Sequence, residues 1–467
     1  MLLPFCFAFT QMSVPTLLPA FDREFGASAT WSSWTFSVFM LFAAVSLPLL
    51  GRLADQYGRR RLLLVSAALF VAGSLGCAAA PGLPALIACR AAQGVAAAFI
   101  ALIVTLLSDV LPARRQSMAT GALITAMGLG NVTATAVAPL LASAVSWRLI
   151  FALGALVAAS AFVLIRRWVP EAGARVPARF DAAGATLLAV AIASLMLGLT
   201  EGGSWGWTAP PTLLLFAGAL AAGTAWTVVE LHVAQPMIEL RMLAQRSIAL
   251  TNAASVGLGF ATFASITIVS RLAATPYGVS DDVAATIHHG FGAPTEQLGL
   301  YLLPGCVAGT LGGLTLGRVA GRVGWKWPLV AGAAIIAGGL GTLAVWHAAP
   351  WQVIAVMTIV GVPNIATATT TTRLVADAVG SAQRGVATTM NGVAFQAGGA
   401  IGVQVIAAIL TGSVVAGTSV PTDVAFAGAF AAAAAAAALA IPLALVIPGA
   451  RRRAARAAAP ELAPVSP

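Results

Sequence analysis

The stretch that decides the fold is Gly51-Arg52-Leu53-Ala54-Asp55-Gln56-Tyr57-Gly58-Arg59-Arg60-Arg61. It carries four arginines and one acid, and it separates two runs without any charged residue, at about 33–50 and 62–80. Each run is close to the roughly 20 apolar residues that a membrane-spanning helix needs. The pattern predicts a helical hairpin whose charged turn lies at a membrane surface.

The composition extends this interpretation to the whole chain. Of 467 residues, 59% are hydrophobic and 9% are charged. Soluble domains carry about 25% charged residues, and disordered chains are polar and charged. Both classes are therefore excluded, and an all-α membrane protein remains.

Further apolar runs predict 14 transmembrane helices, at about 1–21, 33–50, 62–80, 84–108, 118–143, 148–167, 183–200, 210–230, 248–270, 296–316, 328–347, 351–374, 385–412 and 424–447. We expect an N-terminal six-helix bundle over 1–167 and a C-terminal six-helix bundle over 248–447. Two additional transmembrane helices and their linkers occupy 168–247, and a basic tail occupies 448–467.

The basic residues give the orientation. Loops after even-numbered spans, with the C-terminal tail, hold 21 of the 25 basic residues. The opposite loops hold Arg23, Arg148 and Arg271, and Arg90 lies inside a span. The positive-inside rule places the basic side, and both termini, in the cytoplasm, so we expect a multi-pass protein of the plasma (inner) membrane. Because these charges lie in short loops, the net charge of +10 does not indicate nucleic-acid binding.

An internal repeat supports two related halves. Gly51, Arg52, Ala54, Gly58 and Arg60 recur 266 residues later as Gly317, Arg318, Ala320, Gly324 and Lys326. Each copy follows an apolar run on the predicted cytoplasmic side. Parallel halves of this kind are typical of one large class of transporters.

The charged stretch also predicts a conformational latch. Gly51 and Gly58 would allow a tight turn between the second and third helices. Asp55 would be attracted to the N-terminal dipole of the helix that starts near Gly385. Asp109 is a natural partner for Arg59, and Arg60 completes the basic surface.

Arg90 is a second candidate site, because an arginine inside a membrane span is costly unless it is paired or hydrated. Gln93 and Gly94 follow it on the same helix. We expect Arg90 to have a role inside the bundle, with Gln11 of the first span as a candidate partner.

With these motifs, the chain resembles the major facilitator superfamily, and within it the 14-span drug:proton antiporter family. The resemblance covers nearly the whole chain and rests on 51–61, on Arg90-x-x-Gln93-Gly94, and on segments 147–151, 202–207 and 398–402. It implies alternating access around a central cavity, export of hydrophobic compounds driven by protons, and a coupling role for Arg90.

Two positions depart from that family. Its fifth helix usually carries Gly-Pro followed by Gly-Gly, where this chain has Ala138-Pro139 and then Ala142-Ser143. Small residues still recur every fourth position, at Gly130, Ala134, Ala138 and Ala142, and predict close helix packing. Many members carry an aspartate in helix 1 where Thr10 stands here. Since no Asp or Glu lies in the middle of a predicted span, the sequence identifies no proton carrier.

Uncharged polar residues are the candidates for a substrate cavity. We select Gln11, Asn391 and Gln396, because the resemblance implies that their helices face the cavity, and Trp34, which lies one turn inside the second span. Asp281-Asp282 and His288-His289 share an outer loop, which we interpret as solvated. We therefore expect no metal and no cofactor.

Three functions compete. The first is an exporter of hydrophobic small molecules that exchanges them for protons. The second is an importer or uncoupled carrier of another solute on the same fold, and the third is a non-transporting sensor or an enzyme. Sparse, uncharged interior groups favour the first, and no pairing of nucleophile and base supports an enzyme. We expect a monomer in a lipid bilayer.

Overall fold

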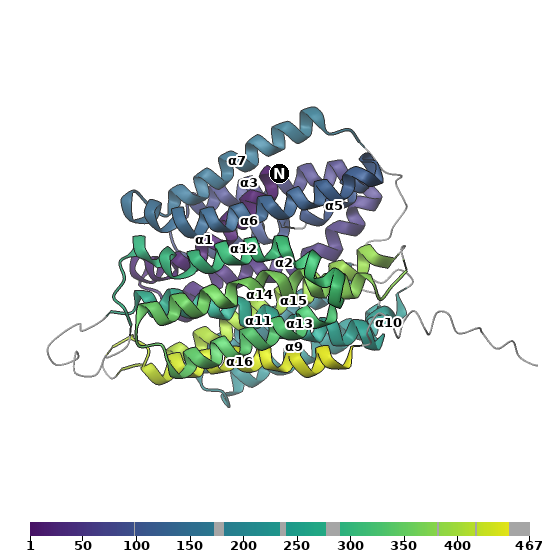
Figure 1. The fold of residues 1–467 in the computed structure, drawn as a ribbon. Helices are drawn as coiled ribbons and strands as arrows, with labels where there is room; N and C mark the ends of the chain where they lie inside the picture. Colours follow the sequence, from purple (N-terminus) through teal and green to yellow (C-terminus); the bar gives the residue numbers. More distant parts are fainter. Residues whose placement is uncertain are drawn as a thin grey trace, which may run out of the picture.

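The computed structural model describes residues 1–97, 99–171, 182–233, 240–276, 290–380, 383–415 and 418–447. Long helices run side by side through the molecule (Figure 1). The basic tail predicted over 448–467 lies outside the described residues.

The first helix group comprises seven helices: α1 (Leu2–Phe25), α2 (Ala29–Tyr57), α3 (Arg59–Ala78), α4 (Leu83–Ala96), α5 (Phe99–Val110), α6 (Ala113–Ala144) and α7 (Arg148–Trp168). Their limits follow local signals: Gly26 ends α1 in the left-handed conformation, and Ser28 caps α2 by accepting the Trp31 N–H. The single span predicted at 84–108 is divided into α4 and α5. The N–H of Ala97 closes α4 on the carbonyl of Gly94, three residues back, which tightens its last turn.

Two helices follow, α8 (Ala182–Trp205) and α9 (Pro210–His232), and then the four-residue α10 (Leu240–Leu243). The second helix group comprises α11 (Arg246–Ala274), the 3₁₀ turn η1 (Thr295–Gln297), α12 (Leu298–Val323), α13 (Lys326–Val345), α14 (Pro350–Ala376), α15 (Arg384–Gly412) and α16 (Asp423–Val446). Eleven of the described helices are long and apolar enough to cross a membrane, while α4 and part of α8 form shorter apolar helices.

The two groups share one packing pattern. In the first, α1 packs on α6 and α7, α2 on α4, and α3 on α4 and α7. In the second, α11 packs on α15 and α16, α12 on α14, and α13 on α14 and α16. Each pairing has its counterpart, so the internal repeat extends to the packing.

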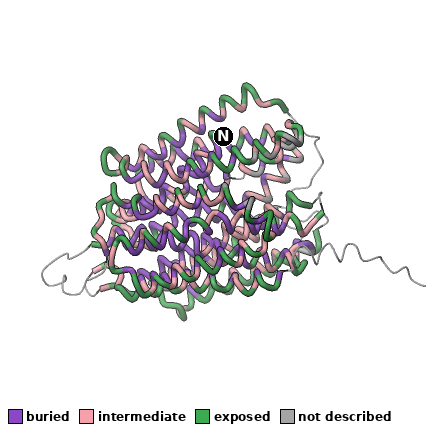
Figure 2. The backbone as a smooth tube through the Cα atoms, in the orientation of Figure 1, coloured by how far each residue is buried: buried purple, intermediate pink, exposed green. Residues whose placement is uncertain are grey.

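Burial separates inner helices from peripheral ones (Figure 2). Of the apolar windows, 83% of the residues in α1 and α2 and 78% of those in α11 are buried, but only 6% of those in α9. α9 packs chiefly on α8, and α8 packs on α2 and α15. The two additional helices therefore lie at the side of the molecule, next to the contact between the groups.

Candidate functional site at the contact between the two helix groups

The two groups meet along three helix pairs: α1 with α11, α2 with α15, and α6 with α12. Glycines allow backbones to approach closely here. A Cβ at Gly299 of α12 would collide with the backbone of Thr135 in α6. A Cβ at Gly399 of α15 would collide with Met40 of α2 and Phe263 of α11. Candidate transport residues must therefore be judged by their position relative to this contact.

Arg90 lies inside the first group with no exposed surface. Its Nε donates to the carbonyl oxygen of Thr35 at 2.9 Å, and its Nη1 donates to Oε1 of Gln93 at 2.6 Å. The Gln93 amide in turn donates to the Ser74 hydroxyl at 2.6 Å. Arg90 thus joins α4 to α2 directly and to α3 through Gln93.

The charge of Arg90 is balanced by aromatic faces rather than by an acid. Its Cζ lies 4.2 Å from the Phe39 ring centroid and 5.9 Å from that of Phe151. No ion pair joins it to a carboxylate in the described part of the chain. The expected pairing with Gln11 is wrong, since Arg90 Nη2 and Gln11 Nε2 are both buried without a described hydrogen-bond partner. Gln93, one turn away on α4, takes that place.

A cluster of neutral polar side chains lies in the second group. Asn391 of α15 is buried, and its amide donates to Asn252 at 3.0 Å and to Ser255 at 2.7 Å, both on α11. Its Oδ1 accepts from Thr372 of α14 at 3.3 Å. Gln396 is half-buried on the same helix. The structure therefore brings Asn391 together with residues that the sequence did not select.

Trp34 takes part in a different network. Its indole N–H donates to Thr200 of α8 at 2.9 Å, and the Thr200 hydroxyl donates to Gln404 of α15 at 3.3 Å. The Gln404 amide donates to Ser37 of α2 at 2.6 Å. Trp34 is thus placed with α8 and α15, and not with Gln11, Asn391 or Gln396. Through Thr200, α8 is bonded to both helix groups.

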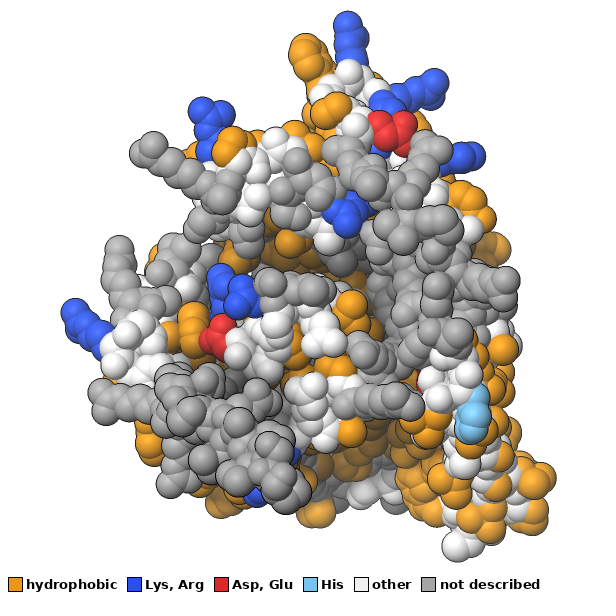
Figure 3. All heavy atoms as spheres, turned by 90° about the vertical axis from the view of Figure 1, so that its right-hand side faces the viewer, with side chains coloured by type: hydrophobic (Ala, Val, Ile, Leu, Met, Phe, Trp, Pro, Cys, Tyr) orange, Lys and Arg blue, Asp and Glu red, His pale blue; other side chains and the backbone are white. Residues whose placement is uncertain are grey.

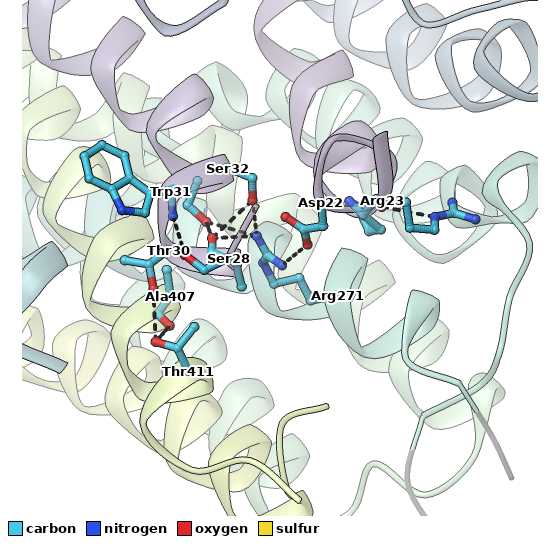
Figure 4. Close-up of polar contacts among 12 residues, drawn as sticks. Asp22, Arg23, Ser28, Thr30, Trp31, Ser32, Arg271, Ala407 and Thr411 are labelled. Carbon is cyan, nitrogen blue, oxygen red and sulfur yellow. Dashed lines mark hydrogen bonds and ion pairs between the residues drawn. The ribbon is translucent and has the colours of Figure 1, made fainter. Parts of the chain in front are cut away.

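Sequence reasoning missed a partly buried ion pair between the groups (Figure 4). Arg271 Nη1 lies 2.7 Å from Asp22 Oδ2, with the two side chains 7% and 24% exposed. Arg271 Nη2 donates to Ser32 at 2.9 Å, to Ser33 at 3.2 Å and to the Ala29 carbonyl at 2.8 Å. We call Asp22, Arg271, Ser32 and Ser33 the outer clasp, because they lie at the helix ends predicted to face outward.

The same end of the molecule carries two further contacts between the groups. Arg23 donates to Thr295 at 2.8 Å. The hydroxyls of Thr30 and Thr411 lie 3.0 Å apart (Figure 4). The sequence predicts Arg271 in an outer loop, but α11 continues to Ala274 and places Arg271 in its last turn. The sequence did contain a signal for this pair. Asp22 and Arg271 both lie at span ends on the predicted outer side, and their charges are opposite.

The stretch 51–61 folds differently from the predicted turn. Gly51 lies inside α2, which continues to Tyr57, so it does not form the turn. Gly58 forms it alone, with φ +99°, and its repeat counterpart Gly324 has φ +80°. Their N–H groups bond the carbonyls of Ala54 and Ala320, which are also 266 residues apart.

The basic residues after these glycines repeat as well. Arg60 Nη2 donates to the Arg166 carbonyl at 2.7 Å, near the end of α7. Its counterpart Lys326 donates to the carbonyls of Leu445 and Ile447 at 2.7 and 3.0 Å, at the end of α16. A cation stabilises a helix C-terminus, so each half holds its last helix in the same way.

The remaining latch residues are described in part. Arg59 Nη1 lies 3.5 Å from the Thr105 carbonyl of α5. The side chains of Asp55 and Asp109 lie outside the described part of the structure. α15 begins at Arg384. The latch stays a prediction.

Gly58→Ala is expected to destabilise the protein by about 1–3 kcal/mol, because a positive φ of this kind strains any residue with a Cβ. Gly51→Ala is the matched control, since its Cβ would meet nothing within 4 Å and alanine favours a helix. The folded fraction left after heating in detergent measures the difference. Equal losses for the two variants would contradict the assignment of the turn to Gly58 alone.

The small residues of α6 face two partners. A Cβ at Gly130 would collide with the backbone of Phe5 in α1, and Ala134 and Ala138 are fully buried. Pro139 lies 3.3 Å from the position of a Cβ on Gly299 of α12. These residues therefore lie where α6 packs on α1 and reaches the second group.

The two ends of the molecule differ. Figure 3 shows the end opposite the outer clasp, where Lys and Arg side chains are scattered over the face and the surface is recessed between the two groups. Among the described residues, no group of three His, Cys, Asp or Glu side chains could hold a metal ion. His288, His289, Asp281 and Asp282 lie outside the described residues.

Comparisons with known proteins agree on one family. The model for the Major Facilitator Superfamily matches residues 1–403. The multidrug resistance protein Stp of Mycobacterium tuberculosis (strain CDC 1551 / Oshkosh) is 28% identical over 329 residues, which span 70% of this chain and 59% of that protein. The tetracenomycin C resistance and export protein of Streptomyces glaucescens is 26% identical over 85% of this chain and 72% of its own length. The xylose transporter XylE from E. coli, solved in a partially occluded inward open conformation, aligns with a TM-score of 0.63 at 14% identity, over 96% of both chains.

Proposed function

The chain belongs to the Major Facilitator Superfamily, and from this premise we propose that it exports hydrophobic small molecules across the cell membrane by alternating access. The observation that carries the proposal is the contact between the two helix groups. It is bonded at one end by the outer clasp and recessed at the other (Figure 3). Relatives named for drug resistance and export support the direction of transport.

We further propose 14 spans, in bundles over 1–167 and 248–447 with α8 and α9 between them, and both termini in the cytoplasm. The helix limits, the shared packing pattern and the basic residues on the recessed end support this arrangement. The protein would act as a monomer in the lipid bilayer.

The character of the buried polar groups supports a hydrophobic substrate. Gln11 and Asn391 are buried amides, and Gln396 is a half-buried one, so the candidate cavity residues carry no charge. Arg90 would respond to the exchange of protons for substrate through its bonds to Thr35 and Gln93. The alternative function is a carrier of another solute, because the fold alone is equally compatible with such a carrier.

Expression in an efflux-deficient host tests the proposal. Resistance to a panel of dyes and drugs should rise, cell accumulation of the dyes should fall, and a protonophore should abolish both effects. Proton-driven export would be contradicted if the expressing cells accumulated more dye than the host, or if they exported dyes equally well with the protonophore. An Arg90→Ala variant at matched protein level serves as the negative control.

Asp55→Asn is expected to lower export with little loss of protein from the membrane. The proposed interaction with the N-terminus of α15 is worth about 0.3–2 kcal/mol, which changes the balance of inward and outward states by roughly 2- to 30-fold. Dye efflux at matched expression measures the effect, with Gln56→Asn as the control on the same turn. Normal efflux by Asp55→Asn would refute the latch.

A further inference from the structure

We infer that the transport pathway selects hydrophobic anions over hydrophobic cations, and that the buried charge of Arg90 sets this selection; the inference rests on the export of hydrophobic compounds proposed above. Arg90 is the one charged residue that lies more than about one and a half turns from both ends of a described helix, and its side chain has no exposed surface. The acids of the described helices all lie within about one turn of a helix end. The middle of these helices therefore carries one positive charge and no negative one.

The other buried charges do not neutralise Arg90. Asp22 lies 2.7 Å from Arg271, so that pair has no net charge. Glu230 is also buried, but it lies two residues from the end of α9 that is predicted to be cytoplasmic. α9 packs chiefly on α8, whereas Arg90 belongs to α4, which packs on α2 and α3. The positive charge of Arg90 therefore has no carboxylate beside it in the described part of the chain.

Arg90 lies one helix away from the contact between the two groups. On one side of α2, the Thr35 carbonyl accepts from Arg90 at 2.9 Å, and the Phe39 ring centroid lies 4.2 Å from its Cζ. On the other side, the ring centroid of Phe36 lies 5.7 Å from that of Phe263 in α11. Because the axes of packed helices lie about 8–10 Å apart, a compound bound at this contact would lie about 10 Å from the guanidinium.

The partners of Arg90 leave its positive field in place. The Thr35 carbonyl, the Gln93 amide and the rings of Phe39 and Phe151 carry no net charge. The Nη2 atom is buried without a described hydrogen-bond partner. At an effective dielectric constant of about 20, a unit charge about 10 Å away changes a binding constant roughly tenfold. A bound anion gains this factor and a bound cation loses it, while a neutral compound is unaffected.

Purified protein tests the selection with one ring system in three charge states. The probes are phenylnaphthylamine, which is neutral, its ring sulfonate, which is an anion, and its ring trimethylammonium derivative, which is a cation. Their fluorescence rises in an apolar site, so a titration gives each dissociation constant. We expect the anion to bind roughly tenfold more tightly than the neutral parent, and the cation roughly tenfold more weakly.

Surface charge is separated from the buried charge by salt. The chain has a net charge of +10, which would itself attract anions in dilute buffer. At about 0.5 M salt the screening length is only a few ångströms, so charges exposed to solvent no longer act on the probes. Buried charges are screened much less, and the order of the three affinities should therefore remain.

Arg90→Gln removes the buried charge and should bring the affinities of the three probes close together. Arg90→Lys keeps the charge and should keep their order, even if its transport falls. Arg23→Gln is the matched control, because it removes one positive charge from an exposed side chain and should leave the order unchanged. If Arg90→Gln lowers the amount of protein, Arg90→Lys still decides, since a loss of selection there would show that the charge is not its cause.

Equal affinities for the anion and the cation in the unmodified protein, selection that disappears at high salt, selection that persists in Arg90→Gln, or an equal loss in Arg23→Gln would each overturn the inference. Transport of the same probes into inverted vesicles separates it from the export proposal. Transport of the cation as fast as the anion would overturn the selection and keep export. Transport of none of the probes, with the expected order of affinities, would refute export and keep the selection.

Discussion

Export by an Arg90→Lys variant is expected to fall nearly as far as export by Arg90→Ala, by about tenfold or more. The guanidinium donates in two directions at once, to the Thr35 carbonyl and to Gln93, and lies over the Phe39 ring. A lysine ammonium keeps the charge but lacks the planar fork that reaches both acceptors. Each charged hydrogen bond contributes about 1.5–3 kcal/mol, and 1.4 kcal/mol corresponds to a tenfold change.

Proton-driven dye transport in vesicles, at matched protein levels, measures this effect. Arg23→Lys is the control, since Arg23 is exposed and donates to Thr295 at the outer end. Transport restored by lysine but not by alanine would show that positive potential alone matters. Full transport by Arg90→Ala would show that Arg90 has no part in the cycle.

Gly94→Val is expected to destabilise the first helix group strongly. A Cβ at Gly94 would collide with the Phe39 carbonyl and would lie 2.9 Å from Cβ of Phe42 and 3.1 Å from the Phe39 carbonyl carbon. Most of these atoms are backbone, so α2 and α4 would have to separate. Overpacking of this kind costs about 1–3 kcal/mol, and more where the backbone must move.

The measurement is the fraction of protein that stays monodisperse in detergent after heating. Gly121→Val in α6 is the control, because a Cβ there would meet nothing within 4 Å. If both variants retain the same fraction, α2 and α4 do not depend on the close approach at Gly94.

The helices could be predicted closely from the sequence because a membrane imposes a length. Most predicted runs overlap one helix, for example 148–167 against Arg148–Trp168. Several helices extend five to seven residues beyond the predicted end, as α2 does from 50 to Tyr57, and the run 84–108 is divided into α4 and α5. The placement of Arg90 inside the bundle was equally predictable, since burying a charge in a membrane needs internal partners. The repeat indicated that Gly58 and Gly324 would behave alike, and their positive φ angles agree.

The side-chain partners could not be predicted, because they depend on which helix ends come together. Asp22 and Arg271 are 249 positions apart, and in the sequence each resembles an ordinary charged residue at the end of a span. Gln11 and Gln93 were both reasonable neighbours for Arg90, and only the packing of α4 selects Gln93. Gly51 shows the same limit: a glycine in a charged stretch suggests a turn, but the helix continues through it.

The position of α8 has a consequence for molecules dissolved in the lipid. It covers the seam between α2 and α15 and is bonded there to Trp34 and Gln404 through Thr200. The seam between α6 and α12, in the described part of the chain, carries only the short η1 at its outer end. The two flanks of the protein are therefore unequal, and a compound diffusing within a leaflet meets a shielded flank on one side and a bare helix junction on the other.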